Sequence, residues 1–231
     1  MSIVSPTWIE VPASRQSGWK GVLGSLEDRM PSSHIYRNVD DVDNWAHETT
    51  HGLNSQLRNK LNPRGNSVFV PDRWACSADD PPGISLSDVA KAVPKTWRGM
   101  SYDLYMRKQT QWWDDTPTYV LDEWTAYANG LHASVETGKD AQASSVMQMT
   151  EFMGYAWALL TLEPNKDSNL AKFVLWFSVR TVKMLKYASG KADLSGAERH
   201  LTLLRTSDDG SRVRDFLVGL GGDEWRRAVI G

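Results

Sequence analysis

Two histidines lie in the middle of a run, residues 41–61, whose apolar residues recur at intervals of three and four. This spacing is typical of a helix with one buried face. Asp40 or Asp41 can cap its start with a side-chain oxygen. On such a helix, His47 and His51 lie one turn apart on the same face. The run therefore predicts a helix that presents two imidazoles to one point.

The rest of the chain predicts a small N-terminal sheet followed by a mostly helical body. Short strands are expected at 7–13, 33–39 and 66–72. Residues 71–83 show neither the spacing of a helix nor the alternation of a strand, and they predict an irregular loop. Helices are expected at 85–93, 100–113, 118–136, 140–162, 168–188, 195–205, 211–219 and 223–229. No linker divides the chain, so we expect a single α+β domain over residues 1–231.

The composition argues against several classes of protein. The formal net charge is −2, with basic residues spread along the chain, so no nucleic-acid partner is expected. Cys76 is the only cysteine and allows no intrachain disulfide, which makes the cytoplasm the default location. Export without a cleaved signal is compatible with the same features. No apolar run is long enough to predict a membrane span.

The two histidines enclose a glutamate in the pattern His47-Glu48-Thr49-Thr50-His51. Zinc accepts imidazole nitrogens at about 2.0–2.1 Å, and two such nitrogens on one helix face can share an ion. Glu48 lies about 100° around the helix from His47. It is therefore placed to act as a general base on a water molecule bound to the metal. Two ordinary helix histidines are the simpler alternative.

A catalytic zinc site usually has three protein ligands and an open position for water. We expect Glu123, near the middle of the 118–136 helix, to be the third. Asp122 is the fallback, with a shorter side chain that reaches less far from the helix, and we expect that replacing it does not weaken zinc binding strongly. His132 lies on the far side of the same helix from Glu123, so both cannot bind one ion. The weaker candidates are Glu136 and Glu151.

The motif at His47 and the downstream glutamate together resemble the gluzincin branch of the zinc metallopeptidases. The stretch EWTAYANGLHAS, which begins at Glu123, also resembles the glutamate helix of lethal-factor-like and Pro-Pro endopeptidase domains. The resemblance covers only these two short segments. It implies a zincin-like fold in which His47, His51 and Glu123 hold Zn²⁺. It also implies that Glu48 is the base in cleavage of a peptide bond in a peptide or protein substrate.

Further roles are expected around such a site. An oxyanion that develops on the substrate needs a hydrogen-bond donor. The candidate donors are Tyr119, Tyr102, Tyr105, Tyr127 and His132. Asp43, one turn before His47, can orient that histidine from behind.

Two other functions compete with a hydrolase. In the first, the chain is a non-catalytic zinc-containing helical binding or effector module. That module needs a fourth protein ligand, from Cys76 or His132, to close the site. In the second, the chain is a helical interaction protein without metal.

Overall fold

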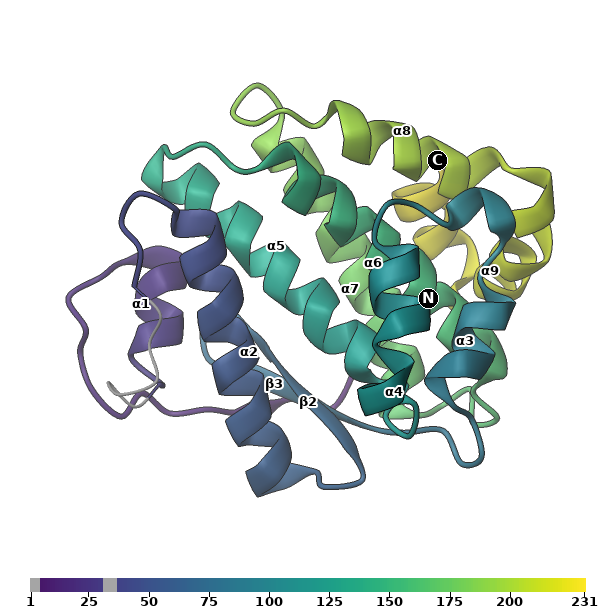
Figure 1. Ribbon diagram of the computed structural model, residues 1–231, viewed down its shortest axis with the longest axis horizontal. Coiled ribbons are helices and arrows are strands. Elements are labelled where there is room, and N and C mark those ends of the chain that lie inside the picture. Colours follow the sequence, from purple (N-terminus) through teal and green to yellow (C-terminus); the bar gives the residue numbers. More distant parts are fainter. Residues whose placement is uncertain (1–4, 31–36) are drawn as a thin grey trace.

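The computed structural model describes residues 5–30 and 37–231 (Figure 1). The chain is mostly helical, with one small antiparallel sheet, which confirms the predicted α+β class. The strands are β1 (Ile9–Glu10), β2 (Gly65–Val70) and β3 (Trp74–Asp79), in the order β1-β3-β2. The predicted strand 33–39 falls mainly outside the described residues, and residues 37–39 are not in a strand.

The central strand β3 contradicts the irregular loop predicted at 71–83. It forms a hairpin with β2 in which Val68 is opposite Cys76 and Val70 is opposite Trp74. The turn between them contains Asp72, whose φ of 98° is unusual for a residue other than glycine. The small residues of β3 carry little periodicity, so pairing with both neighbours decides its conformation.

The two helices expected to carry the metal ligands form close to their predicted limits. Helix α2 spans Val42–Leu61, and the Asp41 side chain accepts a hydrogen bond from the Asn44 N–H at its start. Helix α5 spans Tyr119–Thr137 and ends at Gly138, which takes the left-handed conformation common at helix C-termini.

Most other predicted helices are also confirmed, with differences at the ends. They are α3 (Leu86–Ala92), α6 (Ala143–Leu162), α7 (Asn169–Ala188), α8 (Ser195–Thr206) and α9 (Ser211–Trp225). Gly222 breaks the helical backbone inside α9, near the predicted gap between the last two helices. A π-helical turn, η5 (Arg226–Ile230), follows it. None of the helices in the described part of the chain is long and apolar enough to cross a membrane.

Two segments differ from expectation. The predicted helix 100–113 is a π-helix, η3 (Tyr102–Lys108), followed by the short α4 (Thr110–Trp113). Helix α1 (Gly21–Glu27) was not predicted, since seven residues with two glycines make a poor helix alone. Its first turn is held from outside, because the Val22 N–H donates to the Glu136 carboxylate of α5.

Helix α5 runs through the middle of the molecule, with α2 and the sheet on one side and α6 and α7 on the other (Figure 1). From Tyr119 to Val135 only Asp122 and His132 are not buried. Glu123 therefore lies inside the protein, next to α2.

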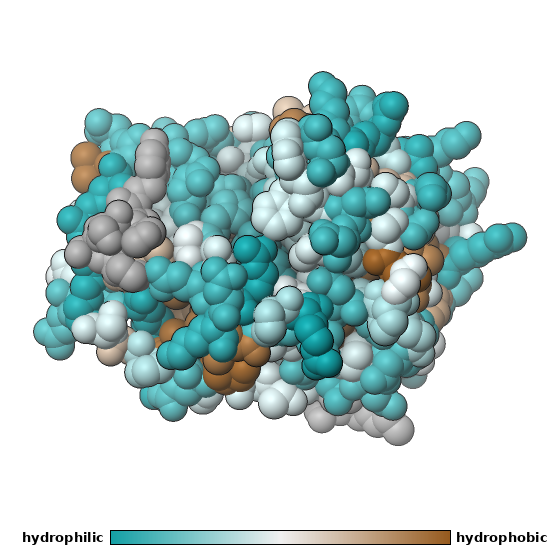
Figure 2. Space-filling model, turned by 60° about the horizontal axis from the view of Figure 1, so that its bottom comes forward, coloured by the Kyte–Doolittle hydropathy of each residue, from teal (hydrophilic) through white to brown (hydrophobic). Residues whose placement is uncertain are grey.

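The surface is mostly hydrophilic on the face shown in Figure 2, with apolar residues in small separate patches. A single domain over residues 1–231 stays a prediction.

Candidate metal centre

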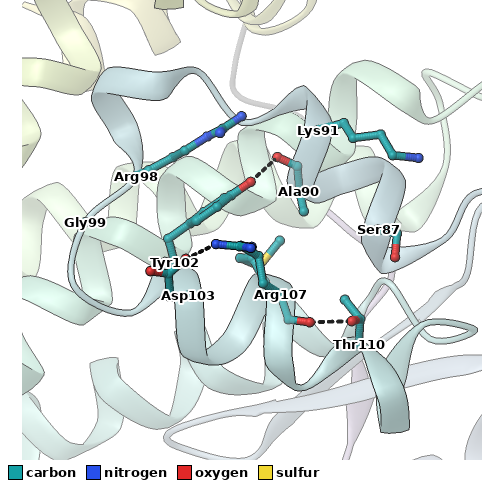
Figure 3. Close-up of a pocket in the computed structure, with 10 residues that line it drawn as sticks. Ser87, Ala90, Lys91, Arg98, Gly99, Tyr102, Asp103, Arg107 and Thr110 are labelled. Atoms are coloured by element: carbon teal, nitrogen blue, oxygen red, sulfur yellow. Dashed lines mark hydrogen bonds and ion pairs between the residues drawn. The ribbon is translucent and has the colours of Figure 1, made fainter.

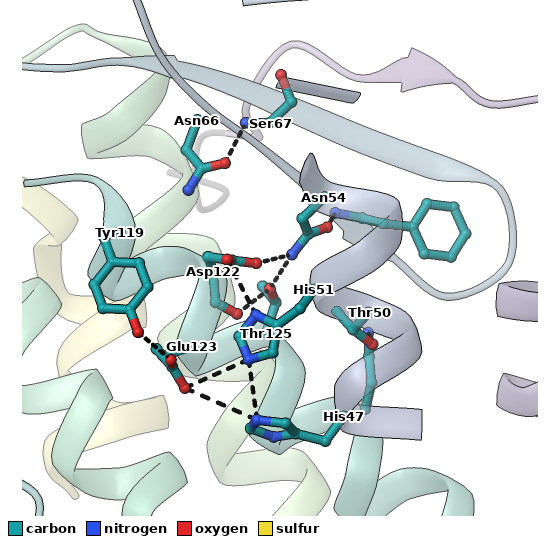
Figure 4. A network of polar contacts seen from close by, with 12 residues as sticks. His47, Thr50, His51, Asn54, Asn66, Ser67, Tyr119, Asp122, Glu123 and Thr125 are labelled. Carbon is teal, nitrogen blue, oxygen red and sulfur yellow. Dashed lines mark hydrogen bonds and ion pairs between the residues drawn. The ribbon is translucent and has the colours of Figure 1, made fainter. Parts of the chain in front are cut away.

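The structure brings His47, His51 and Glu123 together between α2 and α5 (Figure 4). The Nε2 atoms of the two histidines lie 3.0 Å apart. Glu123 Oε2 lies 3.9 Å from Nε2 of His47 and 3.6 Å from Nε2 of His51. A single point lies about 2.1 Å from all three atoms, the distance at which zinc binds such ligands.

The Glu123 carboxylate supports the same interpretation. Its Oε2 atom is buried and has no hydrogen-bond partner among the described residues. An unpaired carboxylate oxygen away from water is costly, unless a cation or a donor satisfies it. The other oxygen, Oε1, accepts a hydrogen bond from the Tyr119 hydroxyl. One oxygen is thus held in place while the other points at the two imidazoles, which fits a metal ligand.

A chain of hydrogen bonds orients His51 from behind. Its Nδ1 lies 3.0 Å from Asp122 Oδ2, and the Asn54 side-chain amide donates to Asp122 Oδ1 at 2.6 Å. Asn54 in turn accepts the backbone N–H of Phe69 in β2 at 2.7 Å. The Asp122 carboxylate accepts the Nδ1 proton of His51, which turns the Nε2 edge of the ring toward His47 and Glu123. Asn54 was not among the predicted site residues, and its only signal in the sequence is its position one turn after His51.

Asp122 therefore has a different role from the one expected. It does not belong to the group of three that could hold a metal ion, and it contacts His51 directly. Asp122 binds the back of a candidate ligand, and such outer contacts typically contribute 10- to 100-fold to metal affinity, as an order of magnitude.

In the protein without metal, the pKa values of the two histidines are shifted in opposite directions. Burial and the neighbouring His51 lower the pKa of His47 to about 3. Burial would also lower the pKa of His51, but the charges of Asp122 and Glu123 outweigh it and raise that pKa well above its usual value. A proton between the two Nε2 atoms then belongs to His51, and His47 accepts it. A metal ion must displace this proton, because only a neutral imidazole is a ligand.

Glu48 projects from the same helix but is exposed, in contrast to His47. Its negative charge still acts on Tyr105 of the π-helix. The Tyr105 hydroxyl lies 2.9 Å from the Tyr127 hydroxyl, and the Tyr127 ring lies 4.4 Å from the His47 ring. Burial, together with the charges of Glu123 and Glu48, raises the pKa of Tyr105 to about 12. Tyr105 and Tyr127 are thus protonated donors beside the candidate ligands.

The hydroxyls of the remaining tyrosine candidates, Tyr119 and Tyr102, bind other groups of the protein. The Tyr119 hydroxyl is bound to Glu123, and its ring stacks on Trp113 at 4.7 Å. Tyr119 therefore positions the carboxylate, which differs from the oxyanion role expected for it. The Tyr102 hydroxyl donates to the Ala90 carbonyl oxygen at 2.7 Å, outside the group of three ligands.

The other sequence candidates do not join the three ligands. His132 pairs with Glu136 at 3.2 Å on another part of α5. Glu151 is buried and accepts the backbone N–H groups of Met100 and Ser101.

Two further candidates also lie apart from the ligand group. Asp43 accepts the N–H of Gln142 at 3.0 Å, and no hydrogen bond joins it to His47 within the described residues. The expected orienting role of Asp43 is therefore not seen. Cys76 is buried in the sheet and is not part of the group that could hold a metal.

Comparison of the chain with protein-family models, curated protein sequences and solved structures finds no match. The case for a metal centre therefore rests on the geometry of His47, His51 and Glu123.

Proposed function

We propose that this protein is a zinc-dependent hydrolase of peptide bonds, with a zincin-like arrangement of α2 and α5. The observation that carries the proposal is the convergence of His47, His51 and the unpaired Oε2 of Glu123 on one point. Glu48 follows the first of these ligands and has its side chain in solvent. Three ligands with an adjacent carboxylate are the usual composition of a catalytic zinc site.

The ligands, Glu48 and Tyr105 have separate roles in the proposed hydrolysis. A zinc ion held by the three ligands would polarise the scissile carbonyl and lower the pKa of a water molecule. Glu48 takes the proton of the attacking water and delivers it to the leaving amine. The Tyr105 hydroxyl donates a hydrogen bond to the carbonyl oxygen as negative charge develops there.

A non-catalytic zinc module is less well supported. A closed structural site usually has four protein ligands. Within residues 5–30 and 37–231, neither Cys76 nor His132 belongs to the candidate ligand group. Three protein ligands leave a position for water, which favours hydrolysis.

Metal analysis together with a peptide-library assay tests the proposed function. We expect protein purified without chelator to hold about one zinc ion per chain, as three convergent ligands require. It should cleave members of a peptide library, lose this activity with a chelator and regain it with added zinc. Protein without metal contradicts the whole proposal. Protein that holds zinc but cleaves no peptide contradicts the hydrolase and supports a binding module.

Tyr105→Phe tests the oxyanion donor on a peptide identified in that library. We expect kcat to fall about 100-fold with KM nearly unchanged, because the lost hydrogen bond forms mainly in the transition state. Tyr187→Phe, on the exposed part of α7, removes a hydroxyl elsewhere and should leave kcat unchanged. If Tyr105→Phe retains the wild-type kcat, the donor is another group.

A further inference from the structure

A cavity of about 620 Å³ lies between α3 and the π-helix η3 (Figure 3). Its walls come from one face of α3, the turn at Arg98 and Gly99, one face of η3, and Thr110 at the start of α4. The volume lies within the range of small-molecule sites, roughly 300–1,000 Å³. None of the candidate metal ligands lines this cavity, so it is a separate feature of the fold.

The lining of this cavity is basic, although the whole chain carries a net negative charge. It includes the cations Lys91, Arg98 and Arg107 and a single acid, Asp103. A second cavity of the same volume, between β3 and the start of α7, is the reverse. Its charged lining residues are Arg64, Asp79, Asp80 and Glu163. The charge of the first cavity therefore favours anions over cations, although Lys91 pairs with Asp88 and Arg107 pairs with Asp103.

The two guanidinium groups are held in place and keep N–H donors without a partner among the described residues. Arg98 donates through Nε and Nη2 to the Val93 carbonyl oxygen, which leaves Nη1. Arg107 uses Nη1 for Asp103 at 2.9 Å, which leaves Nε and Nη2. Arg98 also lies over the Tyr102 ring, 4.7 Å from its centroid. Side chains that are already ordered lose less entropy when they bind a ligand.

We propose that this cavity binds a small organic phosphate. Two guanidinium groups with spare N–H donors suit a phosphate, which accepts hydrogen bonds at several oxygens. The side chains of Ala90, Tyr102 and Met106 give the cavity an apolar part. An inorganic phosphate would leave this part empty, so the ligand carries an organic group next to its phosphate. This proposal does not depend on the zinc centre.

Calorimetric titration of the full chain with phenyl phosphate tests the proposal. At about 0.15 M salt, where exposed charges are well screened, we expect tighter binding than for inorganic phosphate. Arg107→Gln should weaken binding at least about 10-fold, since it removes charged donors. Arg107 is exposed, and its one ion pair in the described part of the chain is with Asp103, so this variant should keep its fold.

Lys108→Gln is the matched control. It makes the same change in charge on the same π-helix, but Lys108 does not line the cavity. Its affinity should equal that of the wild type. Equal losses in the two variants, or undiminished binding in Arg107→Gln, would place the phosphate elsewhere and overturn the proposal. Absence of binding to the wild type would also overturn it, as would a phosphotyrosine peptide that binds far more tightly than phenyl phosphate.

Discussion

Glu123→Ala is expected to weaken zinc binding by more than about 100-fold, since it removes a direct ligand and outer contacts alone contribute 10- to 100-fold. The variant should still fold. In the protein without metal, the Glu123 carboxylate faces His51 and accepts a hydrogen bond from the Tyr119 hydroxyl. We therefore expect the metal-free variant to be less stable than the metal-free wild type, because removing one partner of a buried ion pair leaves the other with less compensation. Asp122 still faces His51 and limits this loss.

Thermal unfolding with and without zinc measures this effect. Zinc at 100 times its Kd stabilises the wild type by about 2.7 kcal/mol, which raises Tm by about 5–10 °C for a chain of this size. In Glu123→Ala the same zinc concentration should raise Tm by no more than about 1–2 °C, because it is then at or below the Kd of the variant. Glu136→Ala removes an exposed carboxylate from α5 outside the candidate ligand group, and it should keep the zinc-dependent rise. An equal rise in Glu123→Ala would remove Glu123 from the site.

Asp122→Ala is expected to have a zinc affinity between those of the wild type and Glu123→Ala. It leaves the three ligands present but removes the acceptor of His51 Nδ1. We expect zinc affinity to fall about 10- to 100-fold, less than for Glu123→Ala. The order of the two variants distinguishes a ligand from a residue that orients one.

Glu48→Gln is expected to abolish peptide hydrolysis while zinc stays bound. The amide cannot take the proton of the attacking water, and loss of a general base typically costs about 10²–10⁴-fold in rate. Zinc affinity and Tm should change little, because Glu48 is exposed and is not one of the three ligands. The measurements are kcat on a cleaved library peptide and zinc content of the purified variant.

Glu198→Gln provides the comparison for that result, since it makes the same exchange at an exposed position of α8. It should keep both zinc and full activity. Hydrolysis that persists in Glu48→Gln would assign the base to another residue. Loss of zinc together with activity would mean that Glu48 supports the metal and has no separate role.

The helical parts of the fold could be predicted because their signals are local. Asp41 caps α2, and Gly138 ends α5, at positions that the sequence pattern already marks. The sheet could be predicted only in part. Strand β3 has small residues and no clear alternation, and its conformation comes from pairing with β1 and β2. The π-helix η3 likewise has no local signal that separates it from an α-helix.

The sequence alone determined that His47 and His51 share one helix face, because spacing of four residues is a property of the helix itself. Only the tertiary structure placed Glu123, and not Asp122, in the group that could hold a metal ion. Both lie on α5, and their roles depend on which side chain points at the imidazoles and which binds their outer edge. The contact that holds Asp122 in place comes from Asn54, 68 residues earlier in the chain. Such a contact depends on how α2 packs against α5, and no local pattern encodes that packing.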